Sequence, residues 1–194
     1  KGNDLEKNIF NTAKKGNLRI LGPNSIGLIN ISDNIILSVN AMLELQDLKK
    51  GSIGVISHSG SLIGALLAHG HSRGIGFSKL VSVGNELDLS VGEIGEMLVN
   101  DPNTDTIILF LETLRNSSEV AEMSRMAHAA GKQIICYKLG KSELGKELAK
   151  SHTGAIAGND DAFNAFINYH GIARVEIFET LLEIPNLFKN KKRS

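Results

Sequence analysis

The chain has 194 residues, of which 42% are hydrophobic and 22% are charged, proportions typical of a globular domain with a sizeable core. Basic and acidic residues each number 21, so the net charge is zero and indicates neither a nucleic-acid-binding groove nor a polybasic membrane patch. The sequence contains no apolar run of about 18 residues and no N-terminal signal-peptide pattern. We therefore expect a protein that acts on small molecules, with no nucleic acid and no membrane as partners.

The single cysteine, Cys136, lies within the apolar run 133–139. Such a position predicts a buried, unreactive thiol rather than a nucleophile. One cysteine excludes a disulfide within the chain, and a reducing compartment is then the default. The expected location is the cytoplasm.

The first 50 residues read as the end of another unit. The chain opens with lysine rather than methionine, and the stretch 1–16 looks like a last helix, so we expect a fragment of a longer chain. Residues 18–24 predict a strand that ends in a Gly-Pro turn, and residues 25–40 predict an irregular β crossing. We interpret residues 1–50 as the tail of a preceding α/β domain plus a linker.

From residue 51, short β-rich runs alternate with longer amphipathic segments, a pattern that predicts parallel strands joined by helices. The predicted strands are 52–57, 77–83, 106–112, 133–139 and 173–178. The predicted helices are 62–74, 90–101, 117–131, 160–171 and 180–190. This pattern favours an α/β fold with a flavodoxin-like, doubly wound parallel sheet over residues 51–188, followed by a charged tail at 189–194.

The first candidate site is the serine-rich loop after the first of these strands. In open α/β sheets, ligands gather beyond the carboxyl ends of the strands, where helix N-termini favour anions. The loop offers donors that can converge on one anion: Ser57, Ser59, Gly60 and Ser61. Phosphate binding and simple capping of the next helix both fit this composition.

Two further strand ends carry polar residues. In the loop 83–90, Asp88 and Ser90 suit helix capping, whereas Asn85 and Glu86 have no evident structural task. Glu112 ends an otherwise apolar strand, where an acidic side chain must be solvated or find a partner. A solvated residue at the edge of the sheet and a catalytic residue both remain open for Glu112.

The segment 138–161 is polar, rich in glycine and unusually long for a connection within a compact domain. It contains four lysines, and these are followed by His152, Thr153 and Gly154. Basic residues and an imidazole fit an acidic substrate or a transferred phosphoryl group, and a surface loop with incidental lysines is the alternative. The other histidines, including His58 in the serine loop, are weaker candidates, and no metal site is predicted.

Six stretches, in order over nearly the whole chain, share one family pattern: GPNSIGLIN, GSIGVISHSGSLIGALL, VSVGNELDLS, LETLRN, KLGKSELG and SHTGAIAG. They resemble the nucleoside-diphosphate-forming acyl-CoA synthetases, which are related to the α-subunit of succinyl-CoA synthetase. The resemblance implies an acid–thiol ligase that converts a carboxylate, coenzyme A and ATP into acyl-CoA, ADP and phosphate. It also implies a phosphohistidine that carries the phosphoryl group between sites.

The resemblance implies a role for each candidate residue. His152 would be the phosphoryl carrier and Glu112 the residue that holds it. The phosphate would be bound by residues of two loops, namely Ser57, Ser59, Gly60, Ser61, Thr153 and Gly154. Asn24 and Ser25 would lie near coenzyme A. The loop that faces the acyl substrate would contain Gly84, Asn85 and Glu86.

The resemblance also implies missing parts. Residues 1–50 would be the end of a Rossmann-like CoA-binding domain. An ATP-grasp domain or subunit, absent from this chain, would bind ATP or ADP with magnesium, so the fragment alone should not complete the reaction. Partners would be that module, a small carboxylic acid and coenzyme A, and a homo-oligomer stays open.

One departure from the pattern matters, and one agreement with it decides between two functions. The chain has GNELD where the succinyl-CoA synthetase α-subunit has a Gly-Gly-Asp type of loop, so succinate is not implied. The alternative function is a non-catalytic, acyl-CoA-sensing region of a protein acetyltransferase, and such regions often lack the reactive histidine. The presence of His152 favours the synthetase.

Overall fold

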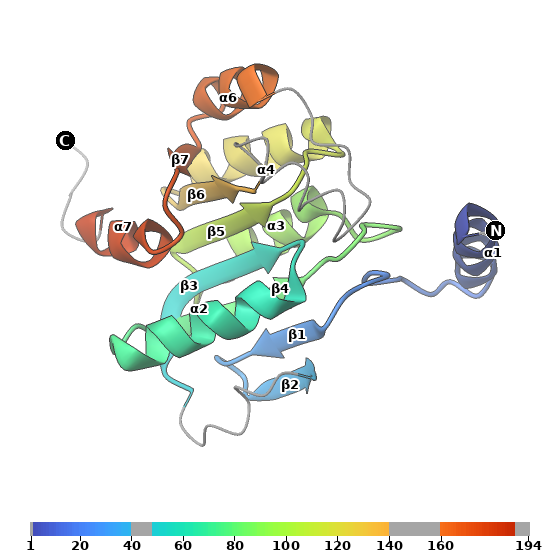
Figure 1. The fold of residues 1–194 in the computed structure, drawn as a ribbon, viewed down its shortest axis with the longest axis horizontal. Coiled ribbons are helices and arrows are strands. Elements are labelled where there is room, and N and C mark those ends of the chain that lie inside the picture. Colours follow the sequence, from blue (N-terminus) through green and yellow to red (C-terminus); the bar gives the residue numbers. More distant parts are fainter. Residues whose placement is uncertain (1, 40–47, 140–159, 189–194) are drawn as a thin grey trace.

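The computed structural model describes residues 2–39, 48–139 and 160–188, and these form one seven-stranded sheet with helices on both faces (Figure 1). The strand order is β2-β1-β4-β3-β5-β6-β7. The last five strands in this order are parallel: β4 (Phe77–Ser82), β3 (Lys50–Ser57), β5 (Thr106–Leu111), β6 (Gln133–Lys138) and β7 (Ala173–Val175). In chain order this is 2-1-3-4-5, so the predicted flavodoxin-like sheet is confirmed.

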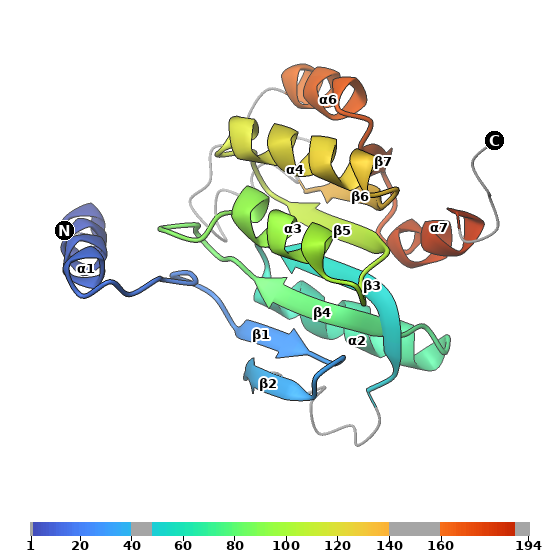
Figure 2. The same ribbon diagram turned by 180° about the vertical axis from the view of Figure 1, so that it is seen from behind.

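The helices divide between the two faces of the sheet, as the two opposite views show (Figures 1 and 2). One hydrophobic core lies under α3 (Val91–Asn100), α4 (Ser117–Ala129) and α6 (Asp160–Tyr169). The other lies under α2 (Gly60–Ser72) and α7 (Thr180–Phe188). Because helices cover both faces, the central strands are buried on both sides, and every residue of β5 is buried.

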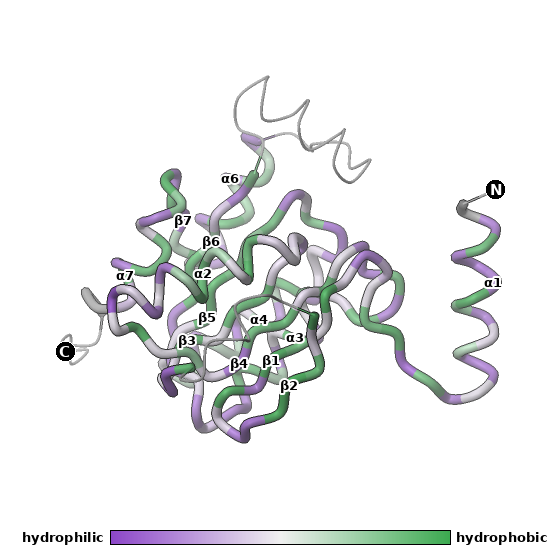
Figure 3. Tube along the Cα trace, turned by 60° about the horizontal axis from the view of Figure 1, so that its bottom comes forward, coloured by the Kyte–Doolittle hydropathy of each residue, from purple (hydrophilic) through white to green (hydrophobic). Residues whose placement is uncertain are grey.

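Hydrophobic residues gather along the strands, whereas α1 (Gly2–Lys15) alternates between polar and apolar positions and stands beside the sheet (Figures 1 and 3). Among the described residues, no helix is long and apolar enough to cross a membrane.

Cys136 of β6 is fully buried, as predicted, and burial raises the pKa of its thiol to about 12. A thiol in this state carries almost no thiolate at neutral pH.

Residues 25–40 are more regular than the predicted β crossing. They contain the antiparallel hairpin of β1 (Gly27–Asn30) and β2 (Ile35–Ser38), and β1 extends the sheet by pairing antiparallel with β4. Gly27 lies at the open end of the hairpin opposite Ser38, and a side chain there would lie 1.9 Å from the carbonyl oxygen of Leu37. The seven-stranded sheet therefore includes residues upstream of position 50.

The strand predicted over 18–24 is not formed. Its backbone instead bonds to the loop 85–89, through Asn85 N to Pro23 O at 2.9 Å and Leu87 N to Gly22 O at 2.9 Å. Residues 84 and 86 adopt positive φ angles, so the loop follows an irregular path and no regular ladder can form. The segment before the hairpin is thus fastened to a loop at the carboxyl end of β4.

Candidate functional site

Three neighbouring strands end at the same edge of the sheet and bring their loops together. Ser57 of β3 pairs with Ser82 of β4 on one side and with Phe110 of β5 on the other. The loops that follow these strands contain the predicted residues of the serine-rich stretch, the GNELD stretch and Glu112. Because β4, β3 and β5 are neighbours in the sheet, residues from three separate sequence motifs lie together in one cluster.

His58 lies at the centre of this cluster. Its ring is 4% exposed, and its Nδ1 accepts a hydrogen bond of 3.0 Å from the backbone N–H of Glu112. Its Nε2 lies 2.8 Å from Oε1 of Glu86. Because Nδ1 is an acceptor, the ring proton is on Nε2 and is donated to the Glu86 carboxylate. Both ring nitrogens are thus occupied, and the imidazole is held in one orientation and one tautomer.

Glu86 is a buried carboxylate with several donors around it. Its side chain is 2% exposed, and its Oε2 accepts a hydrogen bond of 2.8 Å from the N–H of Val91 at the start of α3. Arg115 Nε lies 3.8 Å from Oε1. Burial alone would raise the pKa of Glu86, but the contacts with His58, Val91 and Arg115 outweigh it and hold the pKa below its usual value. Glu86 is therefore ionised at neutral pH.

Glu86 also occupies the left-handed region of the backbone, with φ +52°. A residue with a side chain reaches this conformation only when its surroundings stabilise it. The sequence left Glu86 without a structural task and, by resemblance, in the acyl-substrate loop. The structure turns its carboxylate inward to His58.

Glu112 follows β5 directly and is 4% exposed. The interpretation of a solvated residue at the edge of the sheet is therefore excluded. Its backbone is fixed by the hydrogen bond to His58, and β5 lies in the middle of the parallel sheet. Glu112 is thus an acidic residue buried at the carboxyl end of a central strand, a placement that suits a functional carboxylate.

The serine loop divides into an inner and an outer part. Ser57 is fully buried, and its hydroxyl accepts from Ser59 N–H at 3.0 Å and donates to Ser59 O at 2.7 Å. Ser59 precedes α2 but makes no side-chain capping bond, and its Oγ lies 3.1 Å from Oγ of Ser61. Gly60 and Ser61 open the helix at less buried positions. Ser57 thus shapes the turn, while the outer residues present the start of α2.

The start of α2 lacks the side-chain cap that is present at the start of α3. Ser90 caps α3 by accepting from Glu93 N–H at 3.1 Å, as predicted for that serine. Asp88, the other predicted cap, instead binds Arg19, and this hydrogen bond is the main reason why the pKa of Asp88 lies below its usual value. The first turn of α2 has no such side-chain cap from Ser59, so its amide groups suit an anion.

The loops predicted to lie near coenzyme A and near the acyl substrate touch each other. Ser25 Oγ donates to Ser82 O at 2.6 Å and accepts from Gly27 N–H at 2.9 Å. Asn24 adopts φ +59°, which asparagine tolerates better than most residues. At Gly84, with φ +56°, a Cβ atom would lie 2.1 Å from the carbonyl oxygen of Pro23. Glycine alone allows this close approach.

Gly84→Ala in the full-length protein should therefore destabilise the fold by about 2 to 4 kcal/mol, because the left-handed backbone and the clash with Pro23 add. Thermal unfolding should begin roughly 5 to 15 °C lower. Gly131→Ala is the matched control, since Gly131 has φ +72° but nothing within 4 Å of a new Cβ. An equal effect of the two substitutions would contradict the close packing of the two loops.

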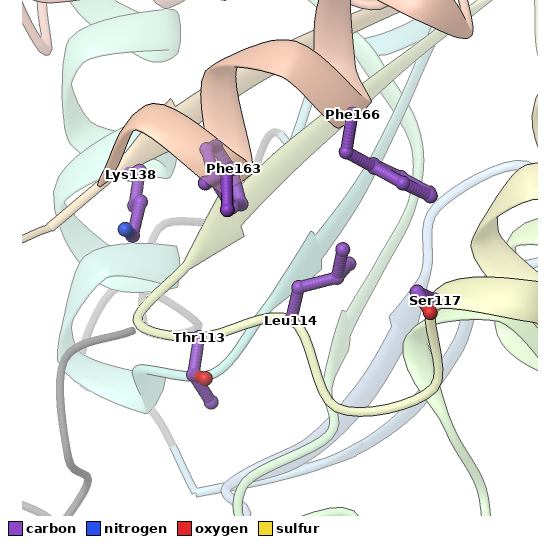
Figure 4. Close-up of a pocket in the computed structure, with 7 residues that line it drawn as sticks. Thr113, Leu114, Ser117, Lys138, Phe163 and Phe166 are labelled. Carbon is purple, nitrogen blue, oxygen red and sulfur yellow. The ribbon is translucent and has the colours of Figure 1, made fainter. Parts of the chain in front are cut away.

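A pocket of about 290 Å³ lies immediately beyond Glu112, between the start of α4 and the helix α6 (Figure 4). Its lining consists of Thr113, Leu114, Ser117, Lys138, Ala162, Phe163 and Phe166. Lys138 Nζ lies 3.2 Å from Oδ1 of Asp160 and 4.6 Å from the centre of the Phe163 ring. Arg174 binds the same carboxylate at 3.1 Å. The pocket is apolar with one buried cation on its wall.

The Lys138–Asp160 ion pair joins the two residues on either side of a long connection. These residues flank the connection 140–159, so the pair fastens its two ends to each other and to Arg174. Burial would raise the pKa of Asp160, but Arg174 and Lys138 outweigh it and lower the pKa below its usual value. Lys138 was predicted only as part of a positive cluster, whereas the structure gives it this anchoring contact.

The predicted residues His152, Thr153 and Gly154 lie outside the described residues, as do the lysines at 141, 146 and 150. His58 is the residue that sequence reasoning ranked too low. The signal was its position directly after a strand predicted to be buried, where an imidazole must be hydrogen-bonded. In the described part of the chain, no group of three or more histidine, cysteine, aspartate or glutamate residues could hold a metal ion.

Comparison with known proteins finds relatives that match nearly the whole chain. The chain is 35% identical over 188 residues to an ADP-forming acetate–CoA ligase of Methanocaldococcus jannaschii, a match that covers 97% of this chain and 26% of that protein. It is 33% identical over 190 residues to the alpha subunit of ADP-forming acetate–CoA ligase I of Pyrococcus furiosus, covering 96% of this chain and 40% of the subunit.

A solved structure with the same fold is the dinucleotide-forming acetyl-coenzyme A synthetase 1 of Ca. Korarchaeum cryptofilum, in complex with phosphate and ADP. It superposes with a TM-score of 0.86 at 28% identity, and the match covers 95% of this chain and 39% of that one. The chain thus spans well under half the length of these relatives. Residues 50–188 match the family described as succinyl-CoA ligase like flavodoxin domain. The predicted resemblance is confirmed, and the chain belongs to this family.

Proposed function

We propose that this chain is the CoA-ligase portion of an ADP-forming acyl-CoA synthetase, in which His152 carries the phosphoryl group. The observation that supports this most is the cluster at the carboxyl ends of β3 and β5. There, a buried Glu112 and the uncapped start of α2 lie at neighbouring strand ends. A carboxylate that orients an imidazole and a helix N-terminus that favours an anion are the parts a phosphohistidine needs.

The proposed chemistry assigns a bond change to each residue. A neutral imidazole nitrogen of His152 attacks the transferred phosphorus, the bond from phosphorus to its leaving oxygen breaks, and a nitrogen–phosphorus bond forms. The other ring N–H donates to Glu112, which fixes the tautomer and stabilises the charge that develops on the ring. A carboxylate oxygen later accepts the phosphoryl group and releases the imidazole. The sulfur of coenzyme A then displaces phosphate from the acyl carbon.

The phosphate site is proposed at the start of α2. Ser59, Gly60 and Ser61 would bind the phosphoryl oxygens through backbone and hydroxyl donors, together with Thr153 and Gly154. Ser57 would hold the turn in shape, since its hydroxyl is engaged by Ser59.

The substrate side is proposed at the two loops in contact, with Asn24 and Ser25 near coenzyme A and with Gly84 and Asn85 facing the acyl group. Glu86 would support that loop from below, because its carboxylate is buried against His58. An ATP-grasp domain or subunit would bind ATP or ADP with magnesium and bring the nucleotide to His152. The full protein would act as a ligase in the cytoplasm.

A thioester assay of the full-length protein tests this function. ATP, magnesium, coenzyme A and a panel of small carboxylic acids, from acetate to hydroxylated and aromatic acids, should yield acyl-CoA with ADP and phosphate in equal amounts for at least one acid. Formation of AMP and pyrophosphate would contradict the proposal, and so would a folded protein that forms no thioester with any acid on the panel.

A further inference from the structure

We propose that His58 is a positioning residue for phosphoryl transfer, which holds the loop of Glu112 in place through its hydrogen bonds to Glu112 and Glu86 without itself accepting the phosphoryl group. This inference rests on the proposed function, because it assigns His58 a task in the reaction attributed to His152 and Glu112. The role follows from the contacts of a single buried ring with two neighbouring loops.

The first step concerns the backbone of Glu112. The N–H of Glu112 donates to Nδ1 of His58 at 3.0 Å, and the N–H of His58 donates to the carbonyl of Phe110 at 3.1 Å. The imidazole therefore fixes the residue that leaves the central strand at the point where its side chain must meet a substrate. A misplacement of about 1 Å at such a residue can cost on the order of 10²-fold in rate.

The second step concerns the far end of the same loop. Oε1 of Glu86 accepts from His58 Nε2 at 2.8 Å and lies 3.8 Å from Nε of Arg115. Arg115 is three residues beyond Glu112, so the loop is held at Glu112 by the imidazole and at Arg115 by the carboxylate that the imidazole anchors. The loop between them also supplies Thr113 and Leu114 to the pocket beyond Glu112 (Figure 4).

The third step concerns the charge of Glu86. The groups that face this carboxylate are His58 from the serine loop, Arg115 from the loop after β5, and the N–H of Val91 at the start of α3. Removing the imidazole would leave the cost of burial opposed only by the other two, so the pKa of Glu86 would rise. Below that raised pKa the carboxyl would be neutral and its attraction to Arg115 lost.

The fourth step excludes His58 as a second carrier. A phosphoryl acceptor needs a free ring nitrogen with access to substrate, and His58 uses Nδ1 as an acceptor and Nε2 as a donor within a ring that is 4% exposed. Phosphorylation at either nitrogen would break one of the two bonds that join the loops. His58 therefore acts through its hydrogen bonds alone.

Two variants of the full-length protein separate these roles. His58→Leu removes both bonds, whereas His58→Gln keeps an amide donor for Glu86 and an amide oxygen for the N–H of Glu112. The measurement is the single-turnover rate of phosphate uptake from ATP and magnesium, between pH 5 and pH 8. His58→Leu should slow this rate by roughly 10²-fold, and because the pKa of Glu86 rises in this variant, the rate should fall further toward pH 5 than it does in the parent protein. His58→Gln should remain within about tenfold of the parent protein, with the pH profile of the parent.

Glu86→Gln serves as a third variant and does not depend on the folding of His58→Leu. It removes the carboxylate charge at every pH, so its rate should be low throughout the range from pH 5 to pH 8. The inference would be overturned if His58→Leu kept the parent rate, or if the leucine and glutamine variants lost the same activity with the same pH profile, which is the result of a purely structural role. A parent-like rate in Glu86→Gln would overturn it as well.

The failure of this inference can be told from a failure of the proposed function. If the parent protein takes up no phosphate, the proposed function fails before any variant is made. Nitrogen NMR of the labelled parent protein then still tests the geometry, because His58 should show a single tautomer with its proton on Nε2. A proton on Nδ1 would contradict the hydrogen bond from Glu112 on which the inference is built.

Discussion

Glu112→Gln in the full-length protein is expected to slow phosphoryl transfer to His152 by roughly 10²- to 10⁴-fold, the range found when a carboxylate that orients a reactive histidine loses its charge. The glutamine has the same size as the glutamate, and the backbone N–H that binds His58 is retained. The substitution should therefore slow the chemical step without displacing the loop. Single-turnover phosphate uptake from ATP and magnesium measures it directly.

A matched control is available on the neighbouring helix. Glu122 lies on α4, is exposed, and pairs with Arg125 three residues away. Glu122→Gln should change neither phosphate uptake nor thioester formation, because an exposed ion pair of this kind contributes little. If Glu112→Gln and Glu122→Gln behaved alike, Glu112 would have no part in the transfer. A Glu112→Gln protein whose unfolding temperature matched the parent would show that any loss was chemical.

Much of the fold could be predicted from the sequence because its central strands carry a strong signal. Runs such as 107–111 are apolar throughout and are followed by amphipathic helices, which is the pattern of a sheet covered on both faces. The hairpin of β1 and β2 was harder to predict. Its strands have four residues each, β2 is largely exposed, and its place depends on the pairing of β1 with β4, in which Asn30 lies opposite Lys79, far along the chain.

The ends of the helices and strands were predicted less accurately than their middles. The helix α2 begins at Gly60 rather than at the predicted Leu62, and β7 ends at Val175 rather than near residue 178. Local residue preferences fix the middle of such elements, whereas their ends depend on contacts between elements distant in the chain. The predicted strand over 18–24 failed for this reason, since its partner is an irregular loop rather than a strand.

The candidate site was predictable in part. Because parallel strands present their carboxyl ends at one edge, the serine loop, the GNELD loop and Glu112 could each be proposed from position alone. The sequence could not reveal that His58 joins them, because a hydrogen bond between Glu112 and His58 spans 54 positions of the chain. For the same reason Glu86 was assigned to the substrate loop, although its carboxylate faces a buried imidazole.

The largest effect is expected at His152. Alanine at this position removes the only nitrogen that the proposed mechanism phosphorylates, so both phosphate uptake and thioester formation should fall to background. His58 cannot replace it, because both of its ring nitrogens are engaged within the buried cluster. His128, in the last turn of α4 and outside this cluster, provides the matched control, and His128→Ala should retain the parent activity.

The measurement that tests the central claim most directly is phosphate labelling of the full-length protein with ATP and magnesium, followed by identification of the modified residue. The account predicts one acid-labile, base-stable phosphate on His152 in the parent protein and none in His152→Ala. It would be contradicted if the His152→Ala protein still took up the label, or if the label in the parent protein were found on another residue.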